Sequence, residues 1–281
     1  MEAGVTESGS GTLYVVSTPI GNMGDFSFRA VEVLQQVATV LAEDTRHSRH
    51  LLDRYAIATP LQPYHEHNEA KATPRLIERL QGGETLALIS DAGTPLLSDP
   101  GARLVRAAVE AGITVSPVPG ASALLAALVA SGLDLDRFTF YGFLPRKGAD
   151  RRSTISDIVD LRHAAVVYEA PARVGDTLAE LAEAGAGDRA TVVARELTKQ
   201  YEELRRGTVT ALAAYYHGAP PRGEVVIVVA GASAPLGATE EDLRTRAAEL
   251  RAEGRPPRDI AAALSAEMGA ARNLAYRLAH E

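Results

Sequence analysis

Short apolar, β-branched runs alternate along most of this chain with stretches of helical periodicity. Such alternation predicts βαβ units and a mainly parallel or mixed sheet, because parallel strands need a crossover that is usually a helix. The expected strands are residues 13–16, 37–42, 85–89, 114–117, 138–141, 165–168, 191–194 and 225–229. The expected helices are residues 29–36, 46–55, 70–80, 102–111, 122–131, 153–161 and 173–184. The fold class is therefore α/β.

Breaks in this pattern predict three domains. Residues 142–150 carry Gly, Pro and charge that interrupt both periodicities, so we expect a first α/β domain over 11–141 and a second over 142–230. Residues 231–238, rich in Gly, Ala and Pro, are expected to form a linker. Residues 239–281 contain no expected strand, and breaks at Gly254 and Gly269 predict about three short helices. This small C-terminal helical domain resembles a helix-turn-helix.

Composition limits what the chain can bind. The formal net charge is -7, so any contact with phosphate must come from a local basic patch. There are 0 cysteines, which excludes disulfides and thiolate metal sites. Residues 1–10 are small and polar, unlike a secretory signal, and the longest apolar run, 121–130, is too short to span a bilayer. We expect a cytoplasmic protein with no membrane partner.

The loops that follow the first four long strands share one composition. Residues 17–22, 43–47, 90–95 and 118–122 combine glycine, proline, small hydroxyl residues or acids. Glycine and small residues let the backbone approach a ligand closely, and ligands gather at the carboxyl ends of strands in open α/β sheets. One Pro-Gly pair before a helix is usually only a turn. Four such loops on one sheet edge predict a small-ligand site.

Familiar nucleotide and metal motifs give no alternative explanation. The sequence contains neither G-x-x-x-x-G-K-[ST] nor H-E-x-x-H. Residues 185–190 match G-x-G-x-x-A by letter, but they follow an expected helix and precede an expected strand. That order is the reverse of a dinucleotide-binding turn, so we interpret the segment as a helix C-terminal turn.

Two clusters hold ionisable groups. The first cluster, residues 43–47, contains two acids, an arginine and a histidine. Asp44 or Thr45 is the natural N-cap of the following helix, but a cap accounts for one acid and not for the rest of the cluster. The second cluster contains His65 and His67, which could be a metal pair without an obvious third ligand, a solvated loop, or a contact to a polar substrate. The candidate catalytic residues are Glu43, Asp44, Arg46, His47 and His65.

A basic segment follows the first domain. It is either an exposed linker with solvated charges or a contact to the phosphate backbone of a nucleic acid. The candidate RNA-binding residues are Arg146, Lys147, Arg151 and Arg152.

Six motifs in order resemble the tetrapyrrole-methylase superfamily. They are Ser-Thr-Pro-Ile-Gly-Asn at 17–22, Ala-Glu-Asp-Thr-Arg-His at 42–47, His-Glu-His-Asn-Glu at 65–69, Ser-Asp-Ala-Gly-Thr-Pro at 90–95, Pro-Gly at 119–120 and Arg-Glu-Leu-Thr-Lys at 195–199. The resemblance extends from about residue 11 to residue 276. Within the superfamily, the chain looks like the members that methylate a cytidine ribose of 16S ribosomal RNA.

The resemblance implies a function and a set of donor contacts. It implies S-adenosylmethionine bound in a cleft between two α/β domains, a homodimer, and a cytidine 2'-hydroxyl at the decoding site of the small ribosomal subunit as the target. The donor-binding positions it implies are Pro19, Ser90, Asp91, Ala92, Thr94, Ser122, Ala123, Glu169 and Leu197.

In the expected reaction, the ribose hydroxyl attacks the sulfonium methyl in line. Glu43, Asp44, His47 and His65 are candidate bases, although a carboxylate could instead stabilise the sulfonium. Arg46 could hold a phosphate in a bidentate grip, and this chemistry requires no metal. A precorrin-type tetrapyrrole methyltransferase and a non-enzymatic module that binds the donor are the alternatives. The basic segment and the helical tail favour RNA over a tetrapyrrole.

Overall fold

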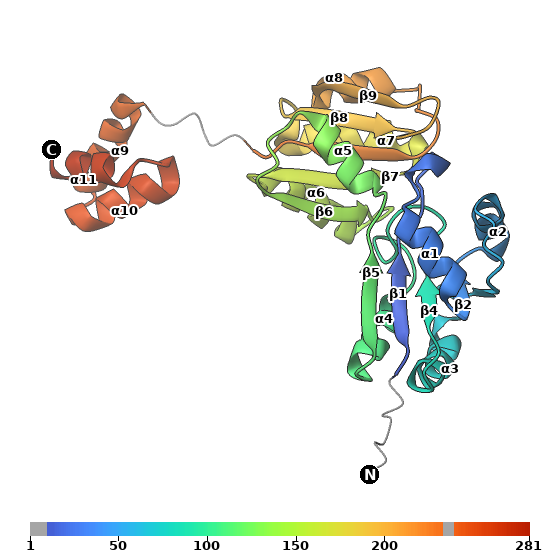
Figure 1. Ribbon diagram of the computed structural model, residues 1–281. Coiled ribbons are helices and arrows are strands. Elements are labelled where there is room, and N and C mark those ends of the chain that lie inside the picture. Colours follow the sequence, from blue (N-terminus) through green and yellow to red (C-terminus); the bar gives the residue numbers. More distant parts are fainter. Residues whose placement is uncertain (1–9, 233–238) are drawn as a thin grey trace, which may run out of the picture.

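The computed structural model describes residues 10–232 and 239–281 (Figure 1). Residues 1–9, for which the sequence argues against a secretory signal, and most of the expected linker lie outside the described residues. The chain forms two five-stranded sheets followed by a group of three helices. The described part holds no helix with the length and apolar character needed to cross a membrane.

The first sheet is entirely parallel, as the alternating pattern predicts. Its strand order is β3-β2-β4-β1-β5. In chain order the strands are β1 (Thr12–Val16), β2 (Thr39–Ala42), β3 (Leu61–Pro63), β4 (Leu86–Leu88) and β5 (Thr114–Val118). The short strand β3 was not expected from the sequence. It lies at the sheet edge and ends in a proline, and proline is tolerated there because no further ladder hydrogen bond is needed.

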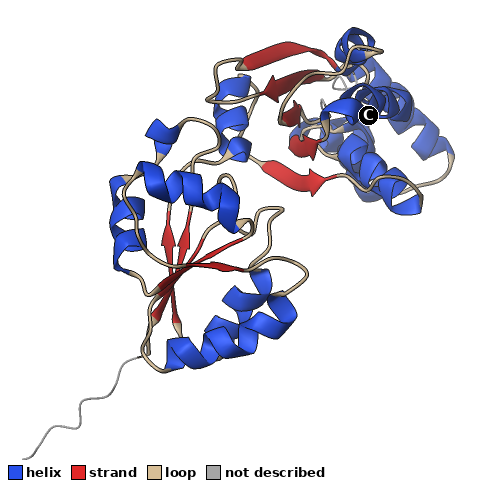
Figure 2. Cartoon of the chain, turned by 90° about the vertical axis from the view of Figure 1, so that its right-hand side faces the viewer, coloured by secondary structure: helices blue, strands red, loops and turns tan. Residues whose placement is uncertain are grey.

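Helices cover both faces of this sheet (Figure 2). Their bounds are α1 (Phe28–Gln36), α2 (Thr45–Arg54), α3 (Glu69–Gln81) and α4 (Ala102–Glu110), with a short η1 (Met23–Asp25) before α1. Leu34 of α1 and Leu52 of α2 belong to the apolar cluster on one face, and Leu76 of α3 and Leu104 of α4 to the cluster on the other. Apolar residues at helical spacing therefore place two helices on each side.

The second sheet is mixed. Its order is β6-β7-β10-β8-β9, and only β6 and β7 pair in parallel. The strands are β6 (Phe138–Phe143), β7 (Ala164–Glu169), β8 (Ala190–Arg195), β9 (Glu203–Thr208) and β10 (Val225–Val229). The central strand β10 is a continuous aliphatic run because both of its faces are covered. The edge strand β9 was not expected from the sequence, because the charged residues Arg205 and Arg206 interrupt the apolar pattern of a strand.

Helix α5 (Ala123–Ser131) links the two sheets. It follows the last strand of the first sheet, and it packs its Leu124 and Leu128 against Val226 and Val228 of β10. The opposite face of β10 packs against the other helices of the second unit. These are α6 (Ala149–Asp160), η2 (Pro171–Arg173), α7 (Val174–Leu181), η3 (Ala182–Ala186) and α8 (Val209–Tyr216).

The sheet pairing corrects the expected boundary at residue 141. Strand β6 pairs with β7, so it belongs to the second sheet, and the change of sheet lies before Phe138. Gly142 has φ +64° and sits at a register shift in β6. The glycine that suggested a linker therefore marks a β-bulge within a strand. The expected turn at 185–190 is confirmed, because Gly185, with φ +110°, interrupts the last helical turn, which ends at Ala186 before β8.

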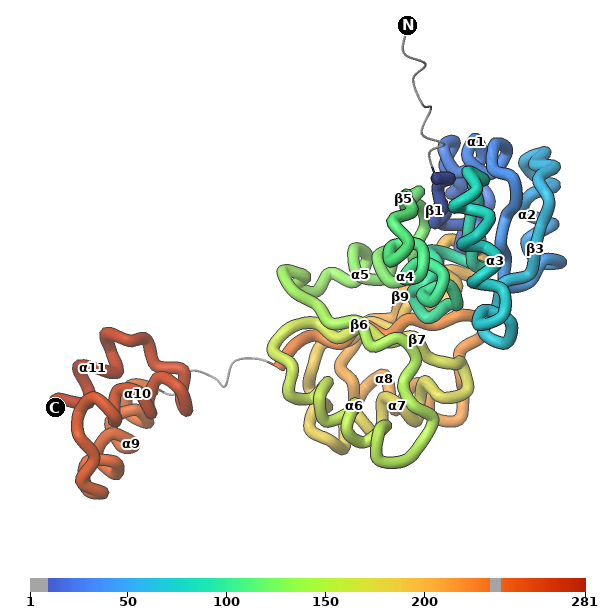
Figure 3. Tube along the Cα trace, turned by 90° about the horizontal axis from the view of Figure 1, so that it is seen from below, coloured from blue at the N-terminus to red at the C-terminus, as the bar shows by residue number. Residues whose placement is uncertain are grey.

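The three expected C-terminal helices are confirmed as α9 (Glu240–Ala252), α10 (Pro257–Met268) and α11 (Arg272–His280). They share a core of their own that includes Leu250, Ile260 and Leu278, and Figure 3 shows them grouped together. Thr239 and Asp242 form a capping box at the start of α9. Gly269, with φ +69°, ends α10 in the left-handed conformation that glycine favours.

Candidate functional site

A cleft of about 430 Å³ opens where the carboxyl edge of the first sheet meets the second sheet. Both sheets contribute walls, and the first-sheet wall lies at the carboxyl ends of its strands, where ligands bind in open α/β sheets. The first-sheet side supplies Ile20, Glu43, Asp91, Ala92, Gly93, Thr94, Leu97, Ser98, Asp99, Ser122 and Ala123. The second-sheet side supplies Phe143, Tyr168, Glu169, Ala170, Pro171, Gly223, Glu224, Val225 and Val226.

Three of the predicted strand-end loops are tied to one another beneath the cleft. Thr18 and Gly93 exchange two backbone hydrogen bonds, of 2.8 and 3.1 Å. The Thr94 hydroxyl lies 3.0 Å from the Ser17 hydroxyl and donates to the Ala121 carbonyl at 3.2 Å. Because these bonds join loops from three strands, the cleft wall is preorganised. Gly93 has φ +83°, a conformation that side-chain-bearing residues rarely adopt.

Three acidic residues, Glu43, Asp91 and Asp99, line the first-sheet side of the same cleft. Burial, followed by the charge of Asp91, raises the pKa of Glu43. Burial, with the charges of Glu43 and Asp91, raises the pKa of Asp99 to about 6, against the opposing effect of a Ser90 hydrogen bond. Neighbouring carboxylates repel one another, and a cation that binds between them reduces this repulsion. The cleft is therefore electrostatically suited to a positively charged ligand.

Asp99 is a cleft residue that the sequence analysis missed. It lies on the segment between the 90–95 loop and α4, beyond the loop that the motif drew attention to. The signal available in the sequence was a second acid at the same strand end, within a Ser-Asp-Pro-Gly segment. Nothing in the spacing alone shows that the chain returns to the cleft there.

The structure separates the predicted catalytic residues. Among them Glu43 lines the cleft, whereas Asp44 is the N-cap of α2 and accepts hydrogen bonds from the backbone of Arg46 and His47. These bonds lower the pKa of Asp44. The side chains of Arg46 and His47 are exposed on α2. Asp44 is nevertheless connected to the site, because its backbone nitrogen donates to Asp91 Oδ1 at 3.1 Å.

His65 lies near Glu43, since its charge opposes the rise in the pKa of Glu43. Its Nδ1 is buried without a hydrogen-bond partner, and its ring stands edge-on to that of His67 with centroids 6.0 Å apart. Within residues 10–232 and 239–281, no group of three or more His, Cys, Asp or Glu side chains is arranged to hold a metal. The substrate-contact interpretation of His65 stays a prediction.

The positions implied for the donor divide into cleft residues and supporting residues. Ser90 is buried and its hydroxyl donates to backbone carbonyls of its own loop, Pro19 is buried beside the cleft residue Ile20, and Leu197 belongs to the apolar cluster around α5. The positions that line the cleft are Asp91, Ala92, Thr94, Ser122, Ala123 and Glu169. Ser122 also caps α5, with its hydroxyl accepting from Leu125 N.

The Glu169 carboxylate is buried and bound by neighbouring residues. It accepts hydrogen bonds from the Thr177 hydroxyl at 2.6 Å and the Ala170 nitrogen at 2.9 Å. Arg173 lies 3.5 Å from it and Arg151 3.9 Å. Thr177 and the two arginines do not line the cleft, so the carboxylate is a buried structural group, and Glu169 borders the cleft through its other atoms.

The predicted basic segment forms a separate groove of about 650 Å³ at the start of α6. Arg146, Lys147 and Arg152 are exposed there. Arg151 is only 5% exposed, and its guanidinium donates to Glu180, to the Pro145 carbonyl and to Thr177. Three of the four predicted RNA contacts are thus available to a phosphate. The fourth, Arg151, is engaged in buried contacts within the second unit.

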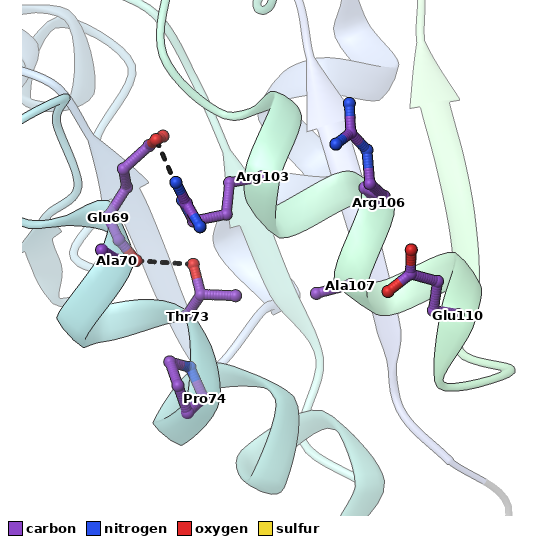
Figure 4. Close-up of a pocket in the computed structure, with 8 residues that line it drawn as sticks. All are labelled: Glu69, Ala70, Thr73, Pro74, Arg103, Arg106, Ala107 and Glu110. Carbon is purple, nitrogen blue, oxygen red and sulfur yellow. Dashed lines mark hydrogen bonds and ion pairs between the residues drawn. The ribbon is translucent and has the colours of Figure 1, made fainter.

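A further groove, of about 440 Å³, lies between α3 and α4 (Figure 4). Arg103 points toward Glu69 and pairs with it at 3.1 Å, and the Thr73 hydroxyl donates to the Glu69 carbonyl at 2.7 Å. Its walls are helix side chains, and none of the four strand-end loops contributes to it. The converging loops and carboxylates therefore mark the cleft between the sheets as the candidate site.

Comparisons with known proteins show the family to which the chain is related. The family model for tetrapyrrole (corrin/porphyrin) methylases matches residues 12–213. The ribosomal RNA small subunit methyltransferase I of Pseudomonas aeruginosa is 49% identical, over 96% of this chain and 97% of that protein. The protein of the same name from Synechocystis sp. is 44% identical, over 96% and 98%.

Solved structures share the fold. A uroporphyrin-III C-methyltransferase from Thermus thermophilus, complexed with S-adenyl homocysteine, has a TM-score of 0.55 at 18% identity, over 78% of this chain and 97% of that one. A diphthine synthase has a TM-score of 0.58 at 16% identity, over 79% and 90%. At these identities the likeness concerns the fold alone.

Proposed function

This chain belongs to the tetrapyrrole methylase family, and we propose that it transfers the methyl group of S-adenosylmethionine to a cytidine 2'-hydroxyl at the decoding site of 16S ribosomal RNA. The observation that carries the proposal is the near-full-length identity of 49% to a ribosomal RNA small subunit methyltransferase I. The cleft supports it, because Glu43, Asp91 and Asp99 make it suited to a sulfonium cation.

The proposed reaction is a single displacement. The ribose 2'-oxygen forms a bond to the methyl carbon while the carbon–sulfur bond breaks, which leaves a neutral thioether and frees the hydroxyl proton. S-adenosylmethionine supplies an electrophilic methyl group. Glu43 takes the proton, because it is the one predicted acidic base that lines the cleft and its raised pKa brings it closer to the working pH. The strand-end loops that are hydrogen-bonded to one another hold the 2'-oxygen, the methyl carbon and the sulfur in line.

RNA contacts are proposed outside the cleft. Arg146, Lys147 and Arg152 form an exposed basic group that suits phosphates, whereas the chain as a whole is acidic, with net charge -7. We therefore expect the assembled small subunit, in the cytoplasm, to be a better substrate than naked ribosomal RNA.

One labelling experiment tests the proposal. The protein is incubated with methyl-labelled S-adenosylmethionine and, in separate reactions, small ribosomal subunits lacking the modification, free 16S RNA, and a uroporphyrinogen. The label should appear on a cytidine ribose in the reaction with small subunits. Little or no label should appear on the uroporphyrinogen. Transfer to the tetrapyrrole with none to RNA would overturn the assignment of the acceptor.

Donor binding should weaken in acid. Asp99 is increasingly protonated below about pH 6, and a sulfonium cation favours its carboxylate form. Titration calorimetry should therefore show affinity falling by up to about tenfold as pH drops from about 8 to about 5. Asp99→Asn should weaken binding at the higher pH and flatten this dependence, and the exposed control Asp136→Asn should match the wild type. A pH-independent wild type would contradict the role of Asp99.

We also propose a homodimer that uses α5. This helix is apolar on all sides, a pattern typical of buried helices, yet Leu125 is 52% and Val129 78% exposed, one turn apart. Leu125→Glu with Val129→Glu should convert a dimer to a monomer in analytical ultracentrifugation. Val109→Glu, at a 62% exposed site on α4, should leave the dimer intact. A wild-type monomer, or a dimer insensitive to the double change, would reject the interface.

A further inference from the structure

A pocket of about 520 Å³ lies in the second unit, on the other side of a loop that walls the cleft. It is formed by the ends of β8 and β9, the end of α8 and the segment after α8. Its lining residues are Arg195, Glu196, Tyr201, Glu203, Tyr215, Tyr216, Ala219, Pro220, Pro221 and Arg222. None of these residues has a role in the proposed methyl transfer.

The pocket presents aromatic rings to solvent. Tyr201 is 67% and Tyr215 52% exposed. The guanidinium of Arg205 lies over the Tyr215 ring, 3.9 Å from its centroid, and the rings of Tyr215 and Tyr216 meet edge-on. Exposed aromatic rings beside an arginine are the groups on which proteins stack unpaired bases of single-stranded RNA.

Two buried polar atoms of this cluster have no hydrogen-bond partner in the described structure. They are the hydroxyl of Tyr216, a residue only 4% exposed, and Nε of Arg205. Buried polar groups are normally satisfied, since an unpaired one costs free energy. The edge of a nucleobase carries acceptors for Nε and both donors and acceptors for a hydroxyl.

The pocket and the cleft share one thin wall. Glu196 lines the pocket, and Glu224 lines the cleft. Lys199 Nζ bridges their carboxylates, at 3.0 and 3.1 Å, while Glu224 N donates to Glu196 Oε1 at 3.2 Å. Gly223 has φ +82°, and a Cβ added at this position would lie 2.1 Å from Glu196 Oε1. A side chain at position 223 would therefore displace Glu196 from the wall. A ligand that crosses this rim reaches both sites.

In the part of the chain that the structure describes, the charged groups at the rim are largely paired with one another, with Arg222 as an exception. Glu196 is paired with Lys199, and Glu203 with Arg195 and Arg205. Arg222 is exposed at the mouth, and the described residues provide it with no ion pair. Lys199 is shared between Glu196 and Glu224, so the acids at the rim are only partly neutralised, and Arg222 is the cationic group available to a phosphate.

We propose that this pocket stacks an unpaired base of the RNA substrate close to the target nucleotide, while the target ribose occupies the cleft. The proposal rests on the proposed RNA substrate. It assigns Tyr201 and Tyr215 as stacking residues and Arg222 as the phosphate contact between the two sites. The RNA must then be single-stranded at this point, because a base within a duplex has no free face for the tyrosines.

Steady-state methylation of small ribosomal subunits by the full-length chain tests the proposal. Tyr201→Ala with Tyr215→Ala should raise KM for the subunit by about tenfold or more. The kcat at saturating subunit and the Kd for S-adenosylmethionine should change little. Tyr201→Phe with Tyr215→Phe, which retains both stacking faces, should stay near the wild type. Phe28→Ala removes a 90% exposed aromatic ring that does not line the pocket and should leave KM unchanged.

The outcomes separate this proposal from the proposed function. If the wild type methylates the RNA and the double alanine variant has the same KM as the wild type, the stacking site is rejected and the proposed function stands. An equal rise in KM for Phe28→Ala, or for the phenylalanine pair, would also reject stacking. If the wild type methylates no RNA, the proposed function itself fails. Circular dichroism and donor affinity show whether each variant is folded, so a misfolded double variant is replaced by Tyr201→Ala alone.

Discussion

Replacing Glu43 with glutamine should lower kcat for methyl transfer by about 10²–10⁴-fold and should weaken S-adenosylmethionine binding far less. Glutamine retains the size of the side chain but cannot accept the 2'-hydroxyl proton. The carboxylates of Asp91 and Asp99 remain in the cleft to hold the sulfonium. Single-turnover kinetics with saturating donor and small subunits measure the chemical step, and calorimetry measures donor binding.

The pH profile adds a second readout. A base acts in its deprotonated form, and burial and Asp91 raise the pKa of Glu43, so the wild-type rate should increase with pH through that raised pKa. The rate that remains in Glu43→Gln should lack this increase. Glu32→Gln, at an exposed acid of α1, is the matched control and should keep the wild-type rate. A normal turnover in Glu43→Gln would remove Glu43 from the mechanism.

Much of this site was predictable because strand ends and small residues leave a direct signal in sequence. Alternating apolar runs predicted the parallel sheet, and Gly93 and Thr94 marked a loop on its carboxyl edge. The direction in which each acid points was not predictable. Glu43 and Asp44 are neighbours, yet one lines the cleft and the other caps α2, because the chain turns from strand to helix between them.

The errors also have physical reasons. Periodicity measures the local apolar pattern, whereas strand pairing is a long-range property, so Gly142 suggested a boundary where the structure has a bulge within β6. Charge in sequence does not show burial. The four basic residues 146, 147, 151 and 152 look equivalent as letters, but Arg151 falls on the inner face of α6 and Arg152 on the outer face.

This difference within one basic segment predicts opposite effects of two neighbouring substitutions. Arg151→Ala should reduce the free energy of unfolding by about 3 kcal/mol, the lower end of the cost of breaking a buried ion pair. The lower end applies because Glu169 would keep Arg173, Thr177 and its backbone partner. Chemical denaturation followed by circular dichroism measures the loss. The same variant should bind S-adenosylmethionine normally under conditions in which it is folded.

Arg152→Ala should change stability by less than about 0.5 kcal/mol, since it removes an exposed side chain. It should instead raise KM for the small subunit, with a rise that shrinks at high salt, because a phosphate contact is screened by counterions. Equal losses of stability in both variants would contradict the buried role of Arg151. An unchanged KM in Arg152→Ala would remove it from the RNA contacts, and the basic groove would then depend on Arg146 and Lys147.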